Sequence, residues 1–541
     1  MLEPAETYAQ VYDAFAWRIP ERYNIVADVV DRHVLARPEA PALIYDNGAD
    51  TVTSYSFLDL YRLAGQCANL FKGHGVEPGD RVALLLGQTP ETAICHLGAW
   101  KIGAITVPLF TLFEEQALAF RLADSGARVV VTDHANYGKI LALRDQLPML
   151  ARVFLIDGLE PDAHDFWVEM EHADDDCATT STRADDPSLL TYTSGTTGPP
   201  KGALHGHRTM LGHMPGFDIL HNFYGQPGDL CWSPADWAWI AGLMDVLMPS
   251  LWHGKPVLAF RAKGAFDPEQ AFHMMAKHRV RNAMLVPTML KLMRQVGDPP
   301  NVDLRSVITG GEPVGPEILE WGERRFGVSV NEGYGQTECN LVTAHVPALM
   351  VAKPGSLGQA APGHIAAIVD TDGEELPAGM EGHLAFHRPD PVMMLEYWRN
   401  PEATRDKFAG DWLLTGDLAT RDEDGYFWFV GRADDVITSA GFRIGPGEIE
   451  DCLSRHPAVL MAAAIGVPDP IRTEVIKAFI IPRDTGDAGP DLEADIRDFV
   501  RTKLARHAYP RQIEFVDSLP MTATGKVMRR VLRERQGEGT A

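Results

Sequence analysis

The sequence predicts an α/β protein with a large N-terminal domain and a small C-terminal one. Between about residues 80 and 132, short aliphatic runs alternate with helix-like stretches, as in RVALLL, ETAICHLGAWKIG and RVVVTD. The same alternation returns between about residues 267 and 338. Such alternation is typical of β-α-β units around a largely parallel sheet. A chain of 541 residues is too long for one hydrophobic core, so we expect two such subdomains in the large domain.

The pattern changes twice in the last third of the chain. Residues 355–430 carry closely spaced Gly, Pro and Asp between short strand-like pieces (HIAAIVD, HLAFHR, YFWFV), which predicts antiparallel structure. After the sequence GRADD, helices are predicted in GEIEDCLSRH and DLEADIRDFVRTKLA, and strands in MAAAIGV and EVIKAFIIP. We therefore predict an N-terminal domain over residues 1–432 and a C-terminal α+β domain over residues 433–541.

Composition and charge argue against several classes of protein. The chain has 49 Lys and Arg against 74 Asp and Glu, and the resulting net charge of −25 repels nucleic acid and anionic membrane surfaces. The cysteines form no CxxC pair, which argues against a disulfide framework and a zinc site. The N-terminus has no signal pattern, and no apolar run is long enough to span a bilayer. We expect a cytoplasmic protein with no nucleic-acid partner and no membrane insertion.

A candidate phosphate-binding loop follows an apolar strand that ends at Tyr192. It reads TSGTTGPPKG, and glycines of this kind let a backbone turn its N–H groups inward while hydroxyls and a lysine add donors. The spacing differs from the P-loop pattern, and a generic run of this composition is more often a linker. The candidate phosphate ligands are Thr193, Ser194, Gly195, Thr196, Thr197 and Lys201.

The string TYTSGTTGPPKG resembles the phosphate-binding signature of the adenylate-forming superfamily of acyl-CoA synthetases, adenylation domains and luciferases. The family's other motifs follow in order, so the resemblance covers nearly the whole chain, and it is greatest to acetyl-CoA and medium-chain acyl-CoA synthetases. It implies two β-α-β subdomains plus a distorted antiparallel barrel in the large domain, and a mobile C-terminal domain. It also implies an enzyme that uses ATP and Mg²⁺ to convert a carboxylic acid to acyl-AMP and then transfers the acyl group to coenzyme A.

The segment NEGYGQTE resembles the family's second nucleotide motif. The resemblance implies that Tyr334 stacks on adenine, Thr337 contacts the α-phosphate and Glu338 positions Mg²⁺. A π face, a hydroxyl and a carboxylate suit these tasks, although the segment alone could be a glycine-flanked turn. Further nucleotide contacts are implied in this motif and in the upstream loop at Gly311, Glu312, Pro313, Glu332 and Gly333.

Two motifs near the predicted domain boundary resemble the family's ribose site and hinge. Asp417 in TGD would accept hydrogen bonds from the ribose hydroxyls, and Arg432 would reach the ribose or the phosphates. Asp434 would be the hinge. In the loop that follows, Arg443 would neutralise triphosphate charge, and Gly441 would leave room for the thiol arm of CoA.

The last motif, LPMTATGK, resembles the segment that carries the adenylation lysine, here Lys526. An ammonium that bridges the carboxylate and the α-phosphate would orient the attack and offset anion repulsion. Without the family, the basic segment after it would suggest an acidic partner. The motif also resembles the pattern around acylated lysines, which implies a lysine acetyltransferase and deacetylase as partners.

Arg501 has the spacing of a CoA 3′-phosphate contact, but a solvated helix arginine fits equally well.

The segment PADWAWIAGL resembles the start of the family's acyl-binding helix and indicates Trp237, Trp239 and Gly242 as pocket residues. Gly335 stands where acetyl-specific members carry a bulky tryptophan. The pocket should therefore accept a short branched, medium-chain or aryl acid. Tryptophans are also common in cores, which is the alternative for either one.

Other functions remain open on the sequence alone. The chain could load an acyl group onto a carrier protein, act as a luciferase-type oxygenase, or be an inactive relative that binds acyl-AMP or a nucleotide. The presence of Lys526, Glu338 and Asp417 argues against an inactive relative. The histidines at 205, 207 and 213 suggest a metal site, but no cysteine or carboxylate nearby in the sequence completes a four-ligand set.

Overall fold

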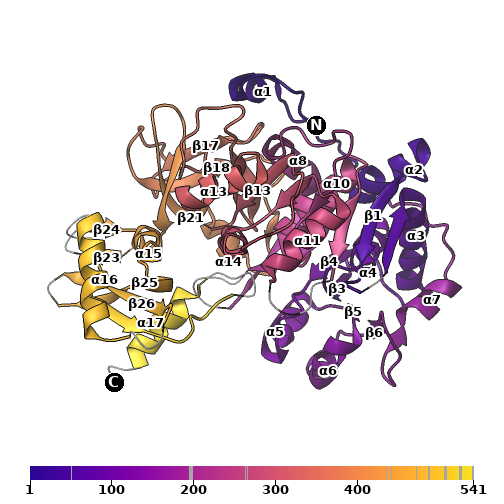
Figure 1. The fold of residues 1–541 in the computed structure, drawn as a ribbon. Helices are drawn as coiled ribbons and strands as arrows, with labels where there is room; N and C mark the ends of the chain where they lie inside the picture. The colour runs from indigo at the N-terminus through magenta and orange to yellow at the C-terminus, as the bar shows by residue number, and fades with distance from the viewer. Residues whose placement is uncertain are drawn as a thin grey trace.

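The computed structural model confirms the α/β class and places a small C-terminal unit, defined here as β23 to α17, beside a larger body (Figure 1). It describes residues 1–538 except 50, 194–198, 262, 263, 265, 313, 434, 436, 440, 441, 471, 485–487, 505–508 and 523–526. For residues 438, 442, 443, 448, 537 and 538 it describes the backbone alone. In this described part of the chain, no helix combines the length and the apolar character needed to cross a membrane.

The first β-α-β subdomain contains an eight-stranded sheet in the order β19-β9-β8-β4-β3-β5-β6-β7. The central strands are parallel and buried along almost their whole length, as expected for a sheet covered on both faces. The strands are β3 (Arg81–Leu85), β4 (Ile105–Pro108), β5 (Val129–Thr132), β6 (Arg152–Leu155), β7 (His164–Asp165), β8 (Pro187–Thr193), β9 (Lys201–Gly206) and β19 (Glu396–Tyr397).

The second subdomain contains a nine-stranded sheet in the order β16-β15-β14-β13-β12-β10-β11-β1-β2. Its middle strands are parallel, and the strands at both edges are antiparallel. The strands are β1 (Pro41–Asp46), β2 (Val52–Ser56), β10 (Cys231–Trp232), β11 (Val257–Phe260), β12 (Asn282–Met284), β13 (Ser306–Gly310), β14 (Val330–Gln336), β15 (Cys339–His345) and β16 (Gln359–Ala360).

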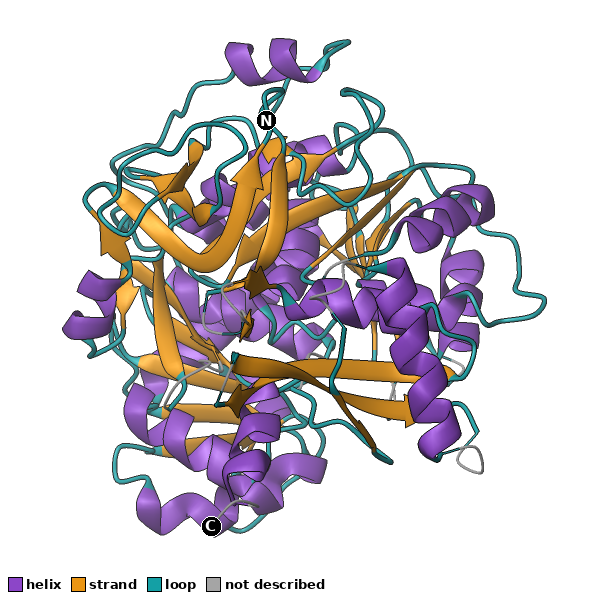
Figure 2. Ribbon diagram, turned by 90° about the vertical axis from the view of Figure 1, so that its left-hand side faces the viewer, coloured by secondary structure: helices purple, strands orange, loops and turns teal. Residues whose placement is uncertain are grey.

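The predicted antiparallel region forms a curled five-stranded sheet, visible among the strands in Figure 2. It is a curled half-barrel in the place of the distorted antiparallel barrel that the resemblance implies. The strands are β17 (Ala366–Val369), β18 (Gly382–His387), β20 (Phe408–Ala409), β21 (Trp412–Arg421) and β22 (Phe427–Arg432). The longest of them, β21, pairs with β18, β20 and β22, so it is the central strand of this sheet.

The C-terminal unit contains the predicted helices and strands. Its sheet has the order β24-β23-β26-β25, with β27 parallel to β26. The elements are β23 (Ile437–Ser439), β24 (Phe442–Ile444), α15 (Pro446–Ser454), β25 (Val459–Asp469), β26 (Thr473–Pro482), α16 (Pro490–Lys503), β27 (Gln512–Phe515) and α17 (Arg529–Glu538). Two hydrophobic clusters of its own fill the two faces of this sheet.

The helices of the larger body cover its sheets and pack into three large hydrophobic clusters. Local sequence fixes several helix ends. For example, Ser56 and Asp59 form a capping box at the start of α3. The principal helices are α1 (Tyr8–Ala14), α2 (Arg32–Ala36), α3 (Phe57–Gly73), α4 (Pro90–Lys101), α5 (Glu115–Ser125), α6 (His134–Leu143), α7 (Phe166–His172), α8 (Thr209–Leu220), α9 (Ile240–Gly242), α10 (Met248–Trp252), α11 (Pro268–His278), α12 (Pro287–Met293), α13 (Pro316–Phe326) and α14 (Pro401–Asp406).

Candidate functional site

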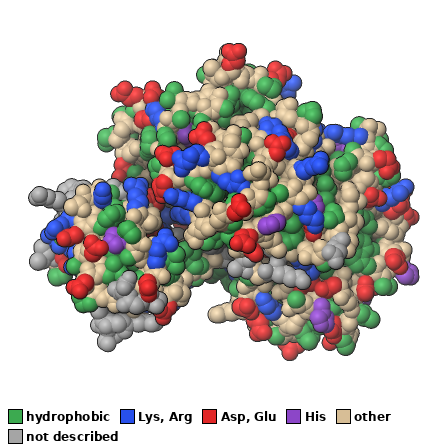
Figure 3. All heavy atoms as spheres, viewed as in Figure 1, with side chains coloured by type: hydrophobic (Ala, Val, Ile, Leu, Met, Phe, Trp, Pro, Cys, Tyr) green, Lys and Arg blue, Asp and Glu red, His purple; other side chains and the backbone are tan. Residues whose placement is uncertain are grey.

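A cavity of about 1970 Å³ lies where the three sheets of the larger body meet the C-terminal unit. Figure 3 shows the surface hollowed between the C-terminal unit and the larger body, with Lys and Arg side chains along this boundary. The cavity therefore collects motifs that are far apart in the sequence. The predicted site residues that line it are Thr193, Lys201, Trp239, Gly311, Glu312, Glu332, Gly333, Tyr334, Gly335, Thr337, Glu338, Asp417 and Arg432.

Asp417 on β21 is the centre of a hydrogen-bond network in the cavity. Its Oδ2 accepts from the Tyr334 hydroxyl at 2.5 Å and from Gln336 Nε2 at 2.8 Å, and its Oδ1 accepts from Arg432 Nη1 at 2.9 Å. Burial, and then the charge of Asp417, raise the pKa of the Tyr334 hydroxyl, so this tyrosine remains a neutral donor. One face of its ring stacks near Phe386. Tyr334 and Asp417, predicted as separate nucleotide contacts, are thus direct neighbours.

Glu338 is a buried carboxylate that keeps its charge. Desolvation alone would raise its pKa, but Lys407 and a hydrogen bond from the Tyr397 hydroxyl at 2.5 Å outweigh that effect and hold the pKa below its usual value. Lys407 is held in turn by the Thr415 carbonyl at 3.1 Å. An ionised carboxylate with hard oxygen atoms at a cavity wall suits a Mg²⁺ ion.

Tyr397 and Lys407 are functional candidates that the sequence did not indicate. Tyr397 lies on β19, which pairs with β9 beside Lys201, and the Lys201 ammonium lies 5.3 Å from the centre of its ring. Lys407 follows α14, and its ammonium also lies 3.4 Å from Gln336 Oε1. Neither residue stands in a recognisable local motif. Only Gln336, inside the NEGYGQTE segment, could have been found from its neighbours.

Two acidic residues of the cavity lining, Glu312 after β13 and Glu332 on β14, have close polar neighbours. Glu312 accepts a hydrogen bond from the Thr288 hydroxyl at 2.7 Å, and Thr288 lines the cavity as well. Glu332 lies 3.6 Å from His345, and burial raises the pKa of its carboxyl group. Thr193 and Lys201 pair across the β8–β9 hairpin at the two ends of the candidate phosphate loop.

The four predicted acyl-binding residues lie in two different environments. Trp239 lines the cavity beside Gly311, where an added Cβ would lie 3.4 Å from the indole ring. Gly335 also lines the cavity, and an added Cβ would lie 2.2 Å from the backbone nitrogen of Leu341. Trp237 is fully buried in the main hydrophobic core, and Gly242 packs against the Asp236 carbonyl. The structure therefore brings Trp239 and Gly335 to the cavity, and Trp237 and Gly242 lie in packed interior.

The C-terminal unit closes one side of the cavity through two arginines of α17. Arg529 pairs with Glu450 at 2.6 Å and with Asp435 at 3.3 Å, and Arg533 pairs with Asp435 at 2.6 Å. Asp435 is buried and follows the predicted hinge residue directly. This network ties the helix after the predicted adenylation lysine to the segment that connects the C-terminal unit to the larger body.

Several predicted residues fall outside the described part of the chain. They are Ser194, Gly195, Thr196, Thr197, Pro313, Asp434, Gly441, Lys526 and the side chain of Arg443. Residues on either side of Lys526 in the sequence line the cavity: Met521 and Thr522 before it, and Val527 and Met528 after it. Arg501 lies on α16, half-exposed, and pairs with Asp498 at 3.0 Å.

The histidines at 205, 207 and 213 are buried in the interior. Burial lowers the pKa of His205 to about 3 and that of His213 to about 4, so both are neutral. The Nδ1 atom of His213 bonds to the Thr209 carbonyl within α8. These positions fit the structural alternative to a metal site.

Comparison with known proteins agrees with this arrangement. Family models described as AMP-binding enzyme and AMP-binding enzyme C-terminal domain match residues 30–398 and 448–526. The chain is 37% identical to acetyl-coenzyme A synthetase of Bacillus subtilis, over 98% of this chain and 95% of that protein. It is 34% identical to the mitochondrial acyl-coenzyme A synthetase ACSM4 of Mus musculus, over 96% of this chain and 91% of that protein.

Among solved structures, the anthranilate CoA ligase AuaEII in complex with anthranoyl-AMP superposes with a TM-score of 0.86. It is 28% identical, and the match covers 96% of this chain and 98% of that one. The motifs gathered around the cavity, the family matches and the relatives along nearly the full length point to the same chemistry. The chain belongs to the AMP-binding enzyme family and is an AMP-forming acid–CoA ligase, which uses ATP and CoA.

Proposed function

We propose that this ligase prefers carboxylic acids larger than acetate, of the short branched, medium-chain or aryl classes. The names of the relatives include both an acetyl-CoA synthetase and an anthranilate ligase, so these names do not decide between small and large acids. The proposal rests instead on the residues of the cavity wall. At Gly335 the backbone approaches Leu341 so closely that the wall has no side chain there, and Trp239 and Gly311 form another part of the lining. No side chain extends from Gly335 over this part of the lining, which suits an acyl group longer or broader than a methyl group.

For the first half-reaction, we assign roles to the residues around the cavity. Thr193 and Lys201 flank the loop that would bind the phosphates, and Asp417 would accept hydrogen bonds from the ribose. Thr337, beside Glu338, would donate to the α-phosphate. The other proposed nucleotide contacts are Ser194, Gly195, Thr196, Thr197, Gly311, Glu312, Pro313, Glu332, Gly333, Tyr334, Arg432 and Arg443.

Glu338 fits the Mg²⁺ ion that would accompany ATP, because it is ionised and offers hard oxygen donors. When bound, the ion would offset negative charge on the phosphates. Lys526 would bridge the substrate carboxylate and the α-phosphate while a carboxylate oxygen attacks phosphorus and pyrophosphate leaves. The position of the flanking residues in the cavity lining supports this role.

For the second half-reaction, we propose that the C-terminal unit turns about Asp434. The turn would remove Lys526 and bring the segment around Gly441 to the acyl-AMP, so that the CoA thiol attacks the acyl carbon and AMP leaves. Domain motions of this kind often limit turnover. A contact between Arg501 and the 3′-phosphate of CoA, acyl-binding roles for Trp237 and Gly242, and a cytoplasmic location stay predictions.

A panel of acids tests the proposed substrate class. Purified enzyme with ATP and Mg²⁺ should release AMP and pyrophosphate in a CoA-dependent manner, and faster with isobutyrate, hexanoate, octanoate or benzoate than with acetate. Trp239→Ala should shift the preference further toward larger acids, because loss of the indole ring enlarges the cavity. Acetate as the best substrate would contradict the proposal. Pyrophosphate exchange without any thioester would instead indicate that the acyl group is loaded onto a carrier protein.

Tyr397→Phe tests the charge state of Glu338. Loss of the hydroxyl removes a hydrogen bond that lowers the pKa of Glu338, so that pKa rises and the carboxylate loses its charge at a higher pH. The acidic limb of the pH–rate profile for ATP should therefore move to higher pH. At neutral pH, kcat/KM should fall roughly tenfold, the effect of losing one charge-assisted hydrogen bond.

Tyr426→Phe is a suitable control for Tyr397→Phe. The Tyr426 hydroxyl also donates one hydrogen bond, to the Val351 carbonyl at 2.8 Å, but it lies outside the cavity lining. An unchanged acidic limb in Tyr397→Phe, or an equal shift in the control, would show that Glu338 does not depend on this hydrogen bond.

Gly445→Ala tests whether the observed position of the C-terminal unit serves the first half-reaction. An added Cβ at 445 would lie 1.9 Å from the Val430 carbonyl, so α15 must move away from β22. Overpacking typically costs ~1–3 kcal/mol, which corresponds to a roughly 5- to 150-fold slower pyrophosphate exchange. Conversion of supplied acyl-AMP to acyl-CoA should fall much less. Gly447→Ala is the matched control because open space surrounds that position; equal rates in both variants would contradict the prediction.

Acetylation of Lys526 by a lysine acetyltransferase, reversed by a deacetylase, is a further proposal from the resemblance. It would remove the charge that the first half-reaction needs. Protein with acetyl-lysine installed at 526 should form acyl-AMP roughly 100-fold more slowly, the effect of losing one catalytic donor. It should still convert supplied acyl-AMP to acyl-CoA. An unchanged rate of acyl-AMP formation would refute the proposal.

A further inference from the structure

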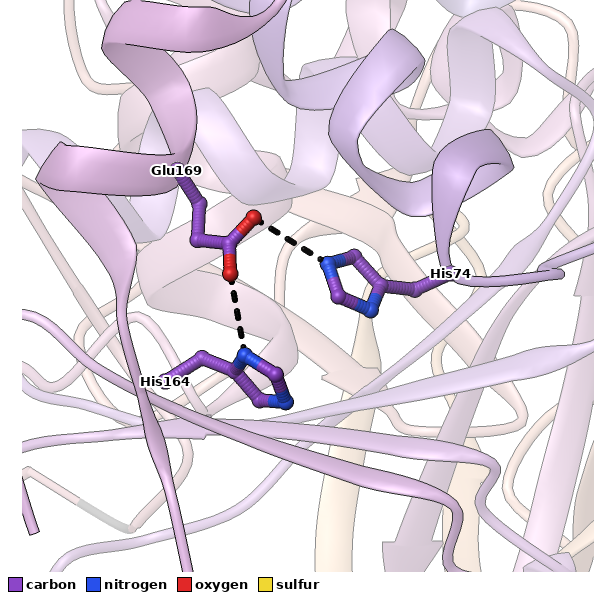
Figure 4. Close-up of side chains that lie close together, drawn as sticks. All are labelled: His74, His164 and Glu169. Carbon is purple, nitrogen blue, oxygen red and sulfur yellow. Dashed lines mark hydrogen bonds and ion pairs between the residues drawn. The ribbon is translucent and has the colours of Figure 1, made fainter.

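Two histidines and a glutamate meet at the edge of the eight-stranded sheet, outside the cavity lining (Figure 4). His74 caps the C-terminal end of α3, His164 lies on the edge strand β7, and Glu169 lies on α7. The three side chains point toward one another from three separate elements. Nothing in the ligase chemistry described above uses them.

The spacing of their polar atoms suits a metal ion. Glu169 Oε2 lies 3.3 Å from His74 Nε2, and Glu169 Oε1 lies 2.9 Å from His164 Nδ1. One ligand atom from each residue lies within 4.8 Å of the other two. Zinc–ligand bonds of ~2.0–2.2 Å in a tetrahedron place ligand atoms roughly 3.3–3.6 Å apart. Small side-chain rotations would therefore bring all three to one ion.

The surroundings hold the two imidazole rings in place. His74 and His164 both pack against the buried ring of Phe154, with ring centres 5.0 and 5.4 Å away. The three candidate ligands are only partly buried, so an ion and a water molecule could reach them. Ligands held in position before binding lose less entropy on coordination.

Arg152 is the cation that opposes metal binding. Its Nε donates to His74 Nδ1 at 3.3 Å, which leaves the Nε2 proton of His74 directed at Glu169. A metal on His74 Nε2 requires the proton on Nδ1 instead, where it would face the guanidinium. The Arg152 contact is exposed, so this side chain can turn away, but the displacement weakens binding.

We propose that His74, His164 and Glu169 bind one divalent transition-metal ion of the zinc class, with water as the fourth ligand. Two imidazole nitrogens and one carboxylate favour such an ion over Mg²⁺ or Ca²⁺, which prefer a shell of oxygen atoms. The ion would join the end of α3 to β7 and α7, and so stabilise the edge of the sheet. Because the site lies outside the cavity lining, its role is structural and not catalytic.

Zinc titration of the full chain after chelator treatment tests the proposal. Wild type should bind one more equivalent of Zn²⁺ than Glu169→Gln or His164→Gln, or bind it at least about tenfold more tightly. Even the loss of an outer-shell partner lowers metal affinity roughly 10- to 100-fold, so the loss of a direct ligand should lower it at least as much. Excess Mg²⁺ should not compete. Arg152→Gln should bind more tightly than wild type. His172→Gln, on the same helix as Glu169, is the matched control and should behave as wild type.

Thermal unfolding gives a second readout that needs no enzyme assay. Zn²⁺ should raise the unfolding midpoint of wild type and of His172→Gln, but not that of Glu169→Gln or His164→Gln. The use of two ligand variants guards against one that fails to fold. Equal stoichiometry, affinity and thermal response in wild type and both ligand variants would overturn the proposal. The three residues would then be a hydrogen-bonded clamp, and any zinc bound would be adventitious.

Discussion

The buried carboxylate of Asp417 is the interaction on which the site depends. It accepts hydrogen bonds from Tyr334 and Gln336 on β14 and from Arg432 on β22, so it joins the nine-stranded sheet to the curled antiparallel sheet. A buried carboxylate without these donors would be strongly unfavourable, and so would the donors without it. The same oxygen atoms are the proposed acceptors for the ribose hydroxyls. Nucleotide binding must therefore share or replace bonds that also hold two sheets together.

The second constraint is charge. The protein carries a net charge of −25, yet its proposed substrates are ATP, CoA and a carboxylate, all anions. Lys201, Lys407 and Arg432 line the cavity and supply local positive charge. Lys407 and the Tyr397 hydroxyl also keep Glu338 ionised although it is buried. The cavity thus places these cations near the proposed phosphate site and keeps Glu338 ionised for the proposed Mg²⁺ ion, although the protein as a whole is acidic.

The C-terminal unit is tied to the cavity by an ion-pair network and by one close backbone approach. Arg529 and Arg533 converge on Asp435, beside the proposed hinge, and Gly445 lies against the Val430 carbonyl. Such contacts can hold one orientation, and because Asp435 is buried, a motion that breaks them must supply other partners or water for its carboxylate. The proposed motion would exchange this network for another set of contacts around the same cavity.

From the sequence alone, hydrophobic periodicity predicts the fold class and elements such as β3, α4, α15 and α16, and the motifs from TYTSGTTGPPKG to LPMTATGK identify the family, because both kinds of signal are local. The sequence also indicated Tyr334, Glu338, Asp417 and Arg432, since each stands in such a motif. Only the tertiary structure brought Tyr397 and Lys407 to Glu338, and separated Trp239 at the cavity from Trp237 in the core. Likewise, His74, His164 and Glu169 come together only through the packing of three elements. The reason is that contacts between residues far apart in the chain depend on strand order and helix packing, which local patterns do not encode.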